Sequence, residues 1–252
     1  MRWDAEGYQK TCGRVTEHGA KLVGLLRGRL RHGKVLDLGC GTGALTNEIA
    51  KFSDEAVGID LSAGMVKKAK TLYPNIRFFV MDACALEWDG HFDAIFSNAV
   101  LHFIKAQDVL LDSVYKALVN NGLFICEFGA AGNTADLLRA VERVLTKRGK
   151  AYSLRFYYPT EAEYRSLLEK HGFHVEAATT YDLDTRLIEG EAGLRDWVGQ
   201  IFNVELDRLG LAERGGAISE IESALKDARW DGSNWHLANR RLRVVARKAQ
   251  SI

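Results

Sequence analysis

The chain has little proline, few cysteines and no long apolar run, and each shortage excludes a class of protein. Its 252 residues include two prolines and four cysteines, and the cysteines lack the CxxC or Cys/His spacing typical of metal sites. No apolar run approaches the roughly 20 residues that span a bilayer. The first six residues are polar and acidic, unlike a secretory signal. We therefore expect a reduced, metal-free, cytoplasmic protein that does not bind a membrane.

Neither sign of charge is in excess. The sequence carries 34 lysines and arginines against 33 aspartates and glutamates, a net charge of +1. Strong nonspecific binding to nucleic acid is therefore not expected. The apolar content of 47% at this length suits one α/β domain, and we predict a single domain over residues 1–252.

Apolar strands alternate with helical patterns through the first 130 residues. The predicted strands cover 34–39, 56–60, 76–80, 92–97 and 123–128, and the predicted helices cover 42–52, 62–73 and 105–118. Parallel neighbours need crossover connections, so this order predicts a doubly wound, mostly parallel sheet with helices on both faces. We expect a helical segment over 1–33 and a ligand-binding core over 34–150.

The second half of the chain follows a different pattern. Thr160 and Glu163 form a capping box that predicts a helix ending at His171. Strands are predicted over 173–181 and 240–246, and the stretch 189–231 between them reads as helical. We expect a helical insertion over about 185–235 that closes over a pocket as a cap.

The stretch from Val35 to Gly43, VLDLGCGTG, is the most informative part of the sequence. Its glycines predict a tight turn where a ligand approaches bare backbone beside the positive end of the next helix. Asp37 precedes the glycines and Asp60 ends the next strand; two carboxylates suit a ligand with a ribose and a cation better than one rich in phosphate. The looser dinucleotide pattern G-x-G-x-x-A also fits, so an NAD(P)-dependent oxidoreductase is an alternative.

Two further polar residues, Asp82 and Asn98, follow the third and fourth predicted strands. The full series resembles the ordered motifs of the Rossmann-like methyltransferases that use S-adenosyl-L-methionine and release S-adenosylhomocysteine. The resemblance implies a seven-stranded sheet whose last strand is antiparallel, with Asp60 on the ribose and Asp82 at the adenine amine. It implies the following further residues at the cofactor site: Tyr8, Asp37, Gly39, Cys40, Gly41, Thr42, Leu61, Met65, Ala83, Asn98 and Ala99.

The residues after the fourth predicted strand indicate the kind of methyl acceptor. Asn98 is followed by Ala99 and Val100, not by the Pro-Pro-aromatic motif of enzymes that methylate nucleic-acid bases, so a small-molecule acceptor is favoured. The stretch 97–103 resembles the trans-aconitate methyltransferase subgroup, as do 3–8, 156–160, 190–197 and 240–247. This resemblance implies O-methylation of a small carboxylic acid. We expect a monomer or a weak homodimer.

A carboxylate acceptor attacks without a general base, but the pocket must hold the acid with cationic or hydroxyl groups. Arg155, Tyr157, Tyr158 and Trp197 are candidates, although the tyrosines could instead pack on the sheet. His102 could orient the acceptor, act as a base for a hydroxyl acceptor, or cap the next helix.

Two expectations concern the rest of the chain. The basic residues near the C-terminus are expected on the solvent face of an edge strand; they are Arg240, Arg241, Arg243, Arg247 and Lys248. A methyltransferase-like binding module without catalysis is a further alternative.

Overall fold

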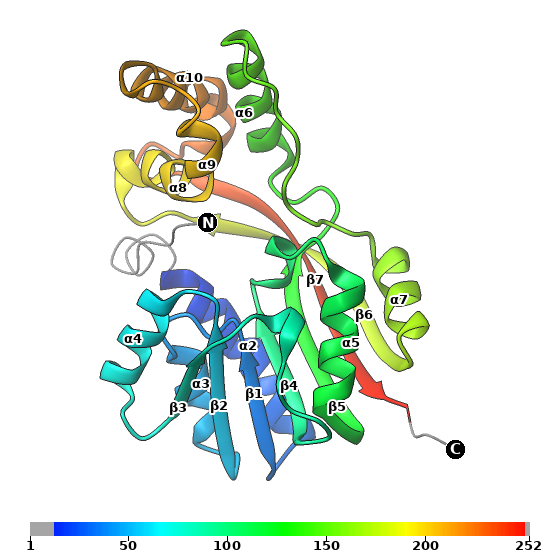
Figure 1. The fold of residues 1–252 in the computed structure, drawn as a ribbon. Coiled ribbons are helices and arrows are strands. Elements are labelled where there is room, and N and C mark those ends of the chain that lie inside the picture. Colours follow the sequence, from blue (N-terminus) through cyan, green and yellow to red (C-terminus); the bar gives the residue numbers. More distant parts are fainter. Residues whose placement is uncertain (1–12, 250–252) are drawn as a thin grey trace. The chain divides into compact units, whose positions relative to one another are not determined.

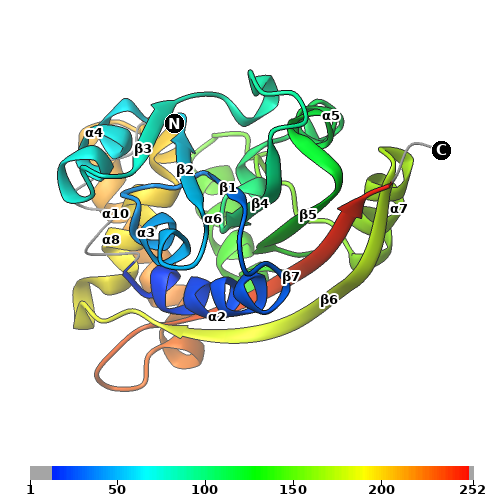
Figure 2. The same cartoon turned by 90° about the horizontal axis from the view of Figure 1, so that it is seen from below.

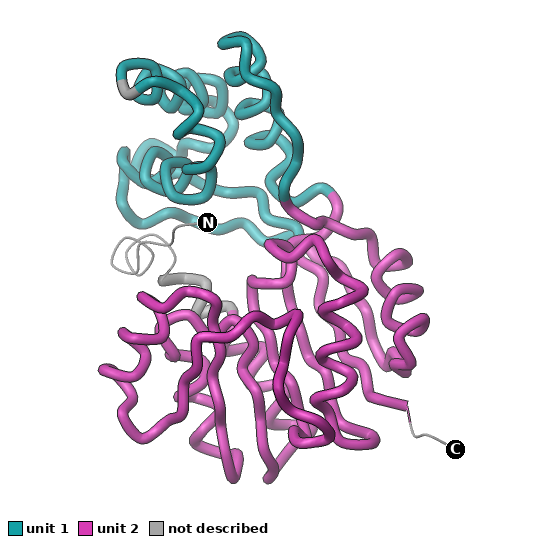
Figure 3. The backbone as a smooth tube through the Cα atoms, in the orientation of Figure 1, with its two compact units in different colours: residues 1–13, 132–155, 182–240 teal, residues 14–131, 156–181, 241–252 magenta. Residues whose placement is uncertain are grey.

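The computed structural model describes residues 13–249, and its contacts divide the chain into two compact units (Figure 3). Unit 1 comprises Met1–Gly13, Gly132–Arg155 and Asp182–Arg240; unit 2 comprises Arg14–Ala131, Phe156–Tyr181 and Arg241–Ile252.

A seven-stranded sheet has the order β3-β2-β1-β4-β5-β7-β6 (Figure 1). The strands are β1 (Lys34–Leu38), β2 (Glu55–Asp60), β3 (Arg77–Val80), β4 (Phe92–Asn98), β5 (Leu118–Gly129), β6 (Phe173–Arg186) and β7 (His236–Lys248). Strands β3, β2, β1, β4 and β5 pair in parallel, whereas β7 pairs with β5 antiparallel. The predicted fold class is confirmed.

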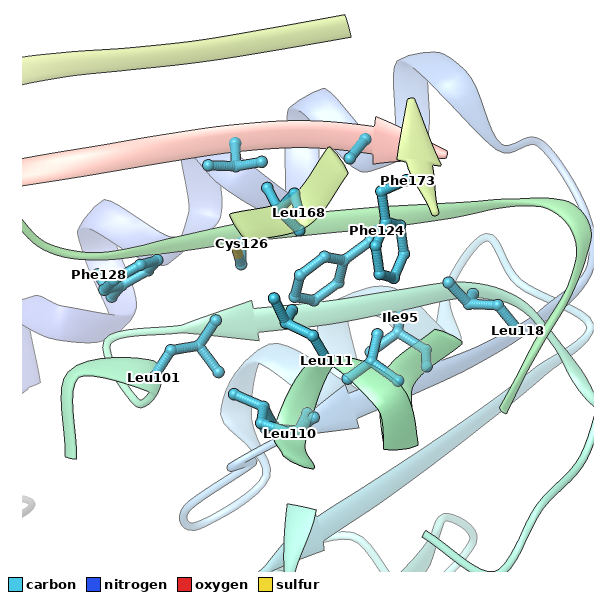
Figure 4. Close-up of a cluster of buried hydrophobic side chains, with 14 of the residues drawn as sticks. Ile95, Leu101, Leu110, Leu111, Leu118, Phe124, Cys126, Phe128, Leu168 and Phe173 are labelled. Atoms are coloured by element: carbon cyan, nitrogen blue, oxygen red, sulfur yellow. The ribbon is translucent and has the colours of Figure 1, made fainter. Parts of the chain in front are cut away.

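Helices of unit 2 cover both faces of its sheet (Figure 2). They are α2 (Gly13–Arg29), α3 (Ala44–Ala50), α4 (Ala63–Leu72), α5 (Gln107–Ala117) and α7 (Glu161–Lys170). On one face Leu22 and Leu26 of α2 pack with Phe96. On the other, Leu111 of α5 and Leu168 of α7 pack in a larger cluster, shown in Figure 4. Burial of these apolar faces holds the helices on the sheet.

The helix starts follow from local hydrogen bonds. Ser62 caps α4, its hydroxyl accepting from the Met65 N–H at 3.4 Å. The predicted capping box is confirmed, because Thr160 accepts from the Glu163 N–H and the Glu163 carboxylate accepts from the Thr160 N–H. The second contact measures 2.8 Å. These caps satisfy N–H groups that the first helical turn leaves without partners.

The helices of unit 1 are α6 (Ala135–Lys147), α8 (Gly193–Ile201), α9 (Asn203–Leu206) and α10 (Leu211–Arg229). The last three occupy the predicted helical stretch 189–231, and α6 was not predicted. Residues 132–155 belong with residues 182–240 to unit 1, whereas the expected ligand-binding core extended to residue 150. The cap and the other domain boundaries stay predictions. Over residues 13–249, no helix is long and apolar enough to cross a membrane.

One expectation about the sheet is wrong. The basic segment near the C-terminus does not form an edge strand, since β7 lies between β5 and β6. Its arginines therefore face neighbouring strands on both sides, and Arg240, Arg243 and Arg247 pair with Asp182, Glu127 and Glu176.

Candidate active site

The turn after β1 places bare backbone at the carboxyl edge of the sheet. Gly39 and Gly41 have φ values of 78° and 53°, a left-handed conformation that favours glycine. A Cβ on Gly39 would lie 2.3 Å from Val100, whereas a Cβ on Gly41 would meet nothing within 4 Å. Gly39 is thus required by packing, and Gly41 faces open space where a ligand can approach. The half-buried Thr42 follows in the same turn.

Asp60, at the end of β2, joins this turn to the start of α4. Its carboxylate accepts from the Gly41 N–H at 3.0 Å and from the Ser62 N–H at 2.8 Å. Burial raises its pKa, and the two backbone hydrogen bonds oppose that shift. A carboxylate has about four acceptor positions, so Asp60 keeps capacity for ribose hydroxyls. The adjacent Leu61 is 71% exposed, an apolar surface suited to a flat ring.

Asp37 is a buried carboxylate without a cation. It is 2% exposed and accepts a hydrogen bond from the Thr46 hydroxyl at 2.6 Å. Burial raises its pKa to about 7, the Thr46 hydrogen bond opposes this, and the negative charge of Asp60 adds to it. No ion pair involves Asp37 among the side chains that the structure describes. A cationic ligand group would lower its pKa and be bound by it.

The other predicted cofactor residues differ in their exposure. Asp82 is exposed, and its carboxylate accepts from the Cys84 N–H at 2.9 Å to start a short turn at Ala83. Met65 and Cys40 are buried, at 3% and 9% exposure, so their predicted contacts with a ligand stay predictions. Within the described chain, no group of three or more His, Cys, Asp or Glu side chains could hold a metal ion.

The backbone at the end of β4 is strained. Ala99 has φ 60°, a left-handed conformation uncommon outside glycine, and its N–H donates to the Glu127 carbonyl at 2.7 Å. The preceding Asn98 pairs in register with Glu127 on β5. Such strain clusters at functional sites, because the surrounding structure must hold it. The predicted cofactor residue Tyr8 lies outside the described residues.

His102 is held as a neutral hydrogen-bond donor. It lies in a short turn, Leu101–Phe103, and is 7% exposed. Burial lowers its pKa to about 3, and the positive charge of Arg241 contributes. Its Nδ1 lies 3.3 Å from the Gly129 N–H, which can only donate, so Nδ1 accepts and the ring proton sits on Nε2. His102 can therefore donate a hydrogen bond through Nε2. In this tautomer Nε2 carries the ring proton and cannot act as a base.

The two predicted tyrosines have different surroundings. The Tyr158 ring lies 5.8 Å from His102 and stacks on Phe156 at 5.6 Å. Tyr157 packs against the core cluster of Figure 4, and its ring lies 6.3 Å from that of Tyr164. Burial raises the Tyr157 pKa. The structure thus brings Tyr158 to His102, while Tyr157 has the sheet-packing role left open above.

Two further candidates belong to unit 1. The Nε of Arg155 lies 2.8 Å from a carboxylate oxygen of Glu205, and its guanidinium also donates to the Ile201 carbonyl. Glu205 is 6% exposed, so a buried carboxylate already balances the charge of Arg155. The Trp197 ring lies 6.2 Å from that of Phe202. Acceptor roles for both residues stay predictions.

Sequence reasoning missed a buried ion pair at the end of β5. Glu127 is 2% exposed and lies 2.6 Å from the Arg243 Nε. The Arg243 guanidinium also donates to the Tyr181 hydroxyl at 3.1 Å. The available signal was one acidic residue in the apolar run LFICEF, since a buried charge needs a partner.

Comparisons with known proteins agree on one chemistry. A family profile described as a methyltransferase domain matches residues 35–122. An uncharacterized methyltransferase of Schizosaccharomyces pombe is 30% identical over 98% of each chain. A trans-aconitate 2-methyltransferase of Methylobacterium nodulans is 27% identical over 90% of each. A phosphoethanolamine N-methyltransferase of Haemonchus contortus, solved with S-adenosylhomocysteine, matches with a TM-score of 0.57 and 21% identity, over 92% of this chain and 53% of that one.

Proposed function

The chain belongs to the Rossmann-like methyltransferases that use S-adenosylmethionine, and on that basis we propose that it methylates a carboxylate oxygen of a small acid. Membership of this family removes the nicotinamide-dependent alternative. The acceptor class is the proposal, and it rests on His102 and its neighbours.

The residues at the carboxyl edge of the sheet fit the cofactor. S-adenosylmethionine supplies, when bound, a methyl group already activated on a sulfonium. Asp60 would hold the ribose, and the uncompensated Asp37 would attract the positively charged end of the molecule. The open side of Gly41 would leave room for close approach to the backbone. Asp82 and Leu61 would hold the adenine.

The hydrogen bond that Nδ1 of His102 accepts from the Gly129 N–H is the observation that carries the acceptor class. With a pKa lowered to about 3 and Nδ1 occupied by the Gly129 N–H, His102 stays neutral and donates through Nε2. A hydroxyl acceptor has a proton that a base must remove, and this tautomer offers no such base. A carboxylate acceptor is already ionised, and an N–H donor helps to hold it. The trans-aconitate 2-methyltransferase relatives support the same acceptor class.

The proposal can be tested by identifying the bond that links the transferred methyl group to the product. The purified chain is incubated with methyl-tritiated S-adenosylmethionine and a panel of small di- and tricarboxylic acids, with catechols and primary amines in parallel. We expect label in a product that releases methanol in mild alkali, because esters hydrolyse there and methyl ethers and methylamines do not. The fully esterified acids are the matched controls and should accept no label. Alkali-stable label from a catechol or an amine, with none from any acid, would contradict the proposal.

A further inference from the structure

The arginines of β7 lie on an interior strand, and most of their charges are balanced. Arg243 lies 2.6 Å from Glu127, and Arg247 lies 2.6 Å from Glu176. Residues 241, 243 and 247 lie on the same side of the strand, because successive side chains of a strand point to opposite faces. Arginine is always protonated, so a buried or half-buried guanidinium needs an anion or several acceptors.

Arg241 differs from these neighbours because its register partner on β5 carries no charge. Its register partner on β5 is Gly129, which has no side chain, whereas the register partner of Arg243 is Glu127. The side chain is half-buried, and its Nε is buried without a hydrogen-bond partner. Among the described residues it forms no ion pair. An unsatisfied buried donor is costly, and a ligand anion would satisfy it.

The position of Arg241 links it to His102. Gly129 pairs with Arg241 in register and donates its N–H to Nδ1 of His102. The guanidinium is close enough to help lower the His102 pKa, and it opposes the rise that burial causes in the Tyr181 pKa. A permanent cation and a neutral N–H donor therefore occur together at the carboxyl end of β5. Together these groups suit a carboxylate, because hydrogen bonds from charged donors are the stronger kind.

We propose that Arg241 holds a carboxylate of the acidic acceptor beside His102. This assignment rests on the proposed function. It replaces Arg155 as the main cationic anchor, because Glu205 already neutralises Arg155 within unit 1. Tyr158, which lies against His102, would border the same acid.

The assignment of Arg241 can be tested by measuring the binding of an acid under conditions in which no methyl group is transferred. The full chain is saturated with S-adenosylhomocysteine and titrated calorimetrically with propane-1,2,3-tricarboxylate or, as the neutral control, the corresponding tricarboxamide. We expect Arg241→Gln to weaken tricarboxylate binding at least tenfold, a typical effect of losing a charged hydrogen bond. Its affinity for S-adenosylhomocysteine and for the tricarboxamide should be unchanged. Arg247→Gln removes a positive charge elsewhere on β7 and should leave tricarboxylate binding within about twofold.

The outcomes separate this inference from the proposed function. Equal tricarboxylate affinity in Arg241→Gln and the parent chain overturns the assignment, and so does no binding by the parent chain. If Arg241→Gln loses binding while the labelled product is alkali-stable, the anion site stands and the ester-forming function fails. If Arg241→Gln fails to fold, Arg241→Lys decides. If Arg241→Lys still binds the tricarboxylate more tightly than the tricarboxamide, the assignment is supported. If Arg241→Lys binds both ligands equally, the assignment is overturned.

Discussion

In unit 2, each end of the carboxyl edge of the sheet holds a charged group without a counter-charge, and the two groups have opposite signs. At the β1–β2 end, Asp37 is buried, and its hydrogen-bond partner among the described residues is the Thr46 hydroxyl. At the β5–β7 end, Glu127 is equally buried but is balanced by Arg243, and Arg241 is the group without a counter-charge. One end therefore has a spare negative charge and the other a spare positive charge.

This difference corresponds to the two reactants of the proposed reaction. A sulfonium donor is cationic and suits the Asp37 end, whereas an ionised acid suits the Arg241 end. Each buried group lacks the partner that folding normally provides, and such groups are expected where a ligand supplies it. Under the proposed function, charge would orient the two substrates along the edge, and mutations can test each end separately.

The largest expected effect comes from breaking the balanced pair. Glu127→Gln leaves Arg243 half-buried without its counter-charge, and we expect the free energy of unfolding to fall by about 3 kcal/mol. Arg241→Gln removes a cation that has no partner, so stability should be unchanged or slightly higher. Urea denaturation of both variants checks this contrast between two β7 arginines. A similar loss in both would mean that Arg241 has a structural partner.

Asp37→Asn should have an intermediate effect that depends on pH. Burial raises the Asp37 pKa above its ordinary 3.8 to about 7, so folding favours the protonated form. Its contribution to stability is full below the unfolded pKa and is lost as the pH rises to about 7, and the part lost above pH 5 is about 2 kcal/mol. Asparagine keeps an acceptor for Thr46 and carries no charge. We expect the variant to be about 2 kcal/mol more stable at pH 8 and little changed at pH 5.

The same substitution should weaken cofactor binding. Without the negative charge, we expect affinity for S-adenosylmethionine to fall about tenfold at pH 8, with a smaller loss below pH 6. Denaturation at both pH values and calorimetric titration check the two effects. An equal stability change at pH 5 and pH 8 would show that ionisation of Asp37 is not the cause.

The sequence predicts the cofactor end of the sheet well, because that end is encoded locally. The glycine turn, Asp60 and Ser62 lie within 24 residues, and the hydrogen bonds that join them span no more than 19 positions. The strand order follows from the alternation of strands and helices. Even here the burial of Cys40 was not visible in the pattern.

The acceptor end is harder to predict, because long-range pairing builds it. Glu127 and Arg243 are 116 residues apart, and only the antiparallel β5–β7 register brings them together. Read alone, the basic segment resembles a solvated edge strand, and that interpretation was wrong because β6 covers it. Helix α6 was missed even though Leu137, Val141 and Val144 repeat at helical spacing and are buried. That pattern was available from the sequence.

Asp82→Ala should have the smallest effect, because the side chain is exposed and competes with water. The carboxylate would accept from the adenine amine, and we expect its loss to weaken S-adenosylhomocysteine binding about three- to fivefold. The analogue with hypoxanthine in place of adenine lacks that amine and is the matched control ligand. The parent chain should prefer adenine by the same factor, and Asp82→Ala should bind both ligands equally. If the variant keeps the preference for adenine, another group reads the amine, and the adenine lies elsewhere along the cofactor end of the sheet.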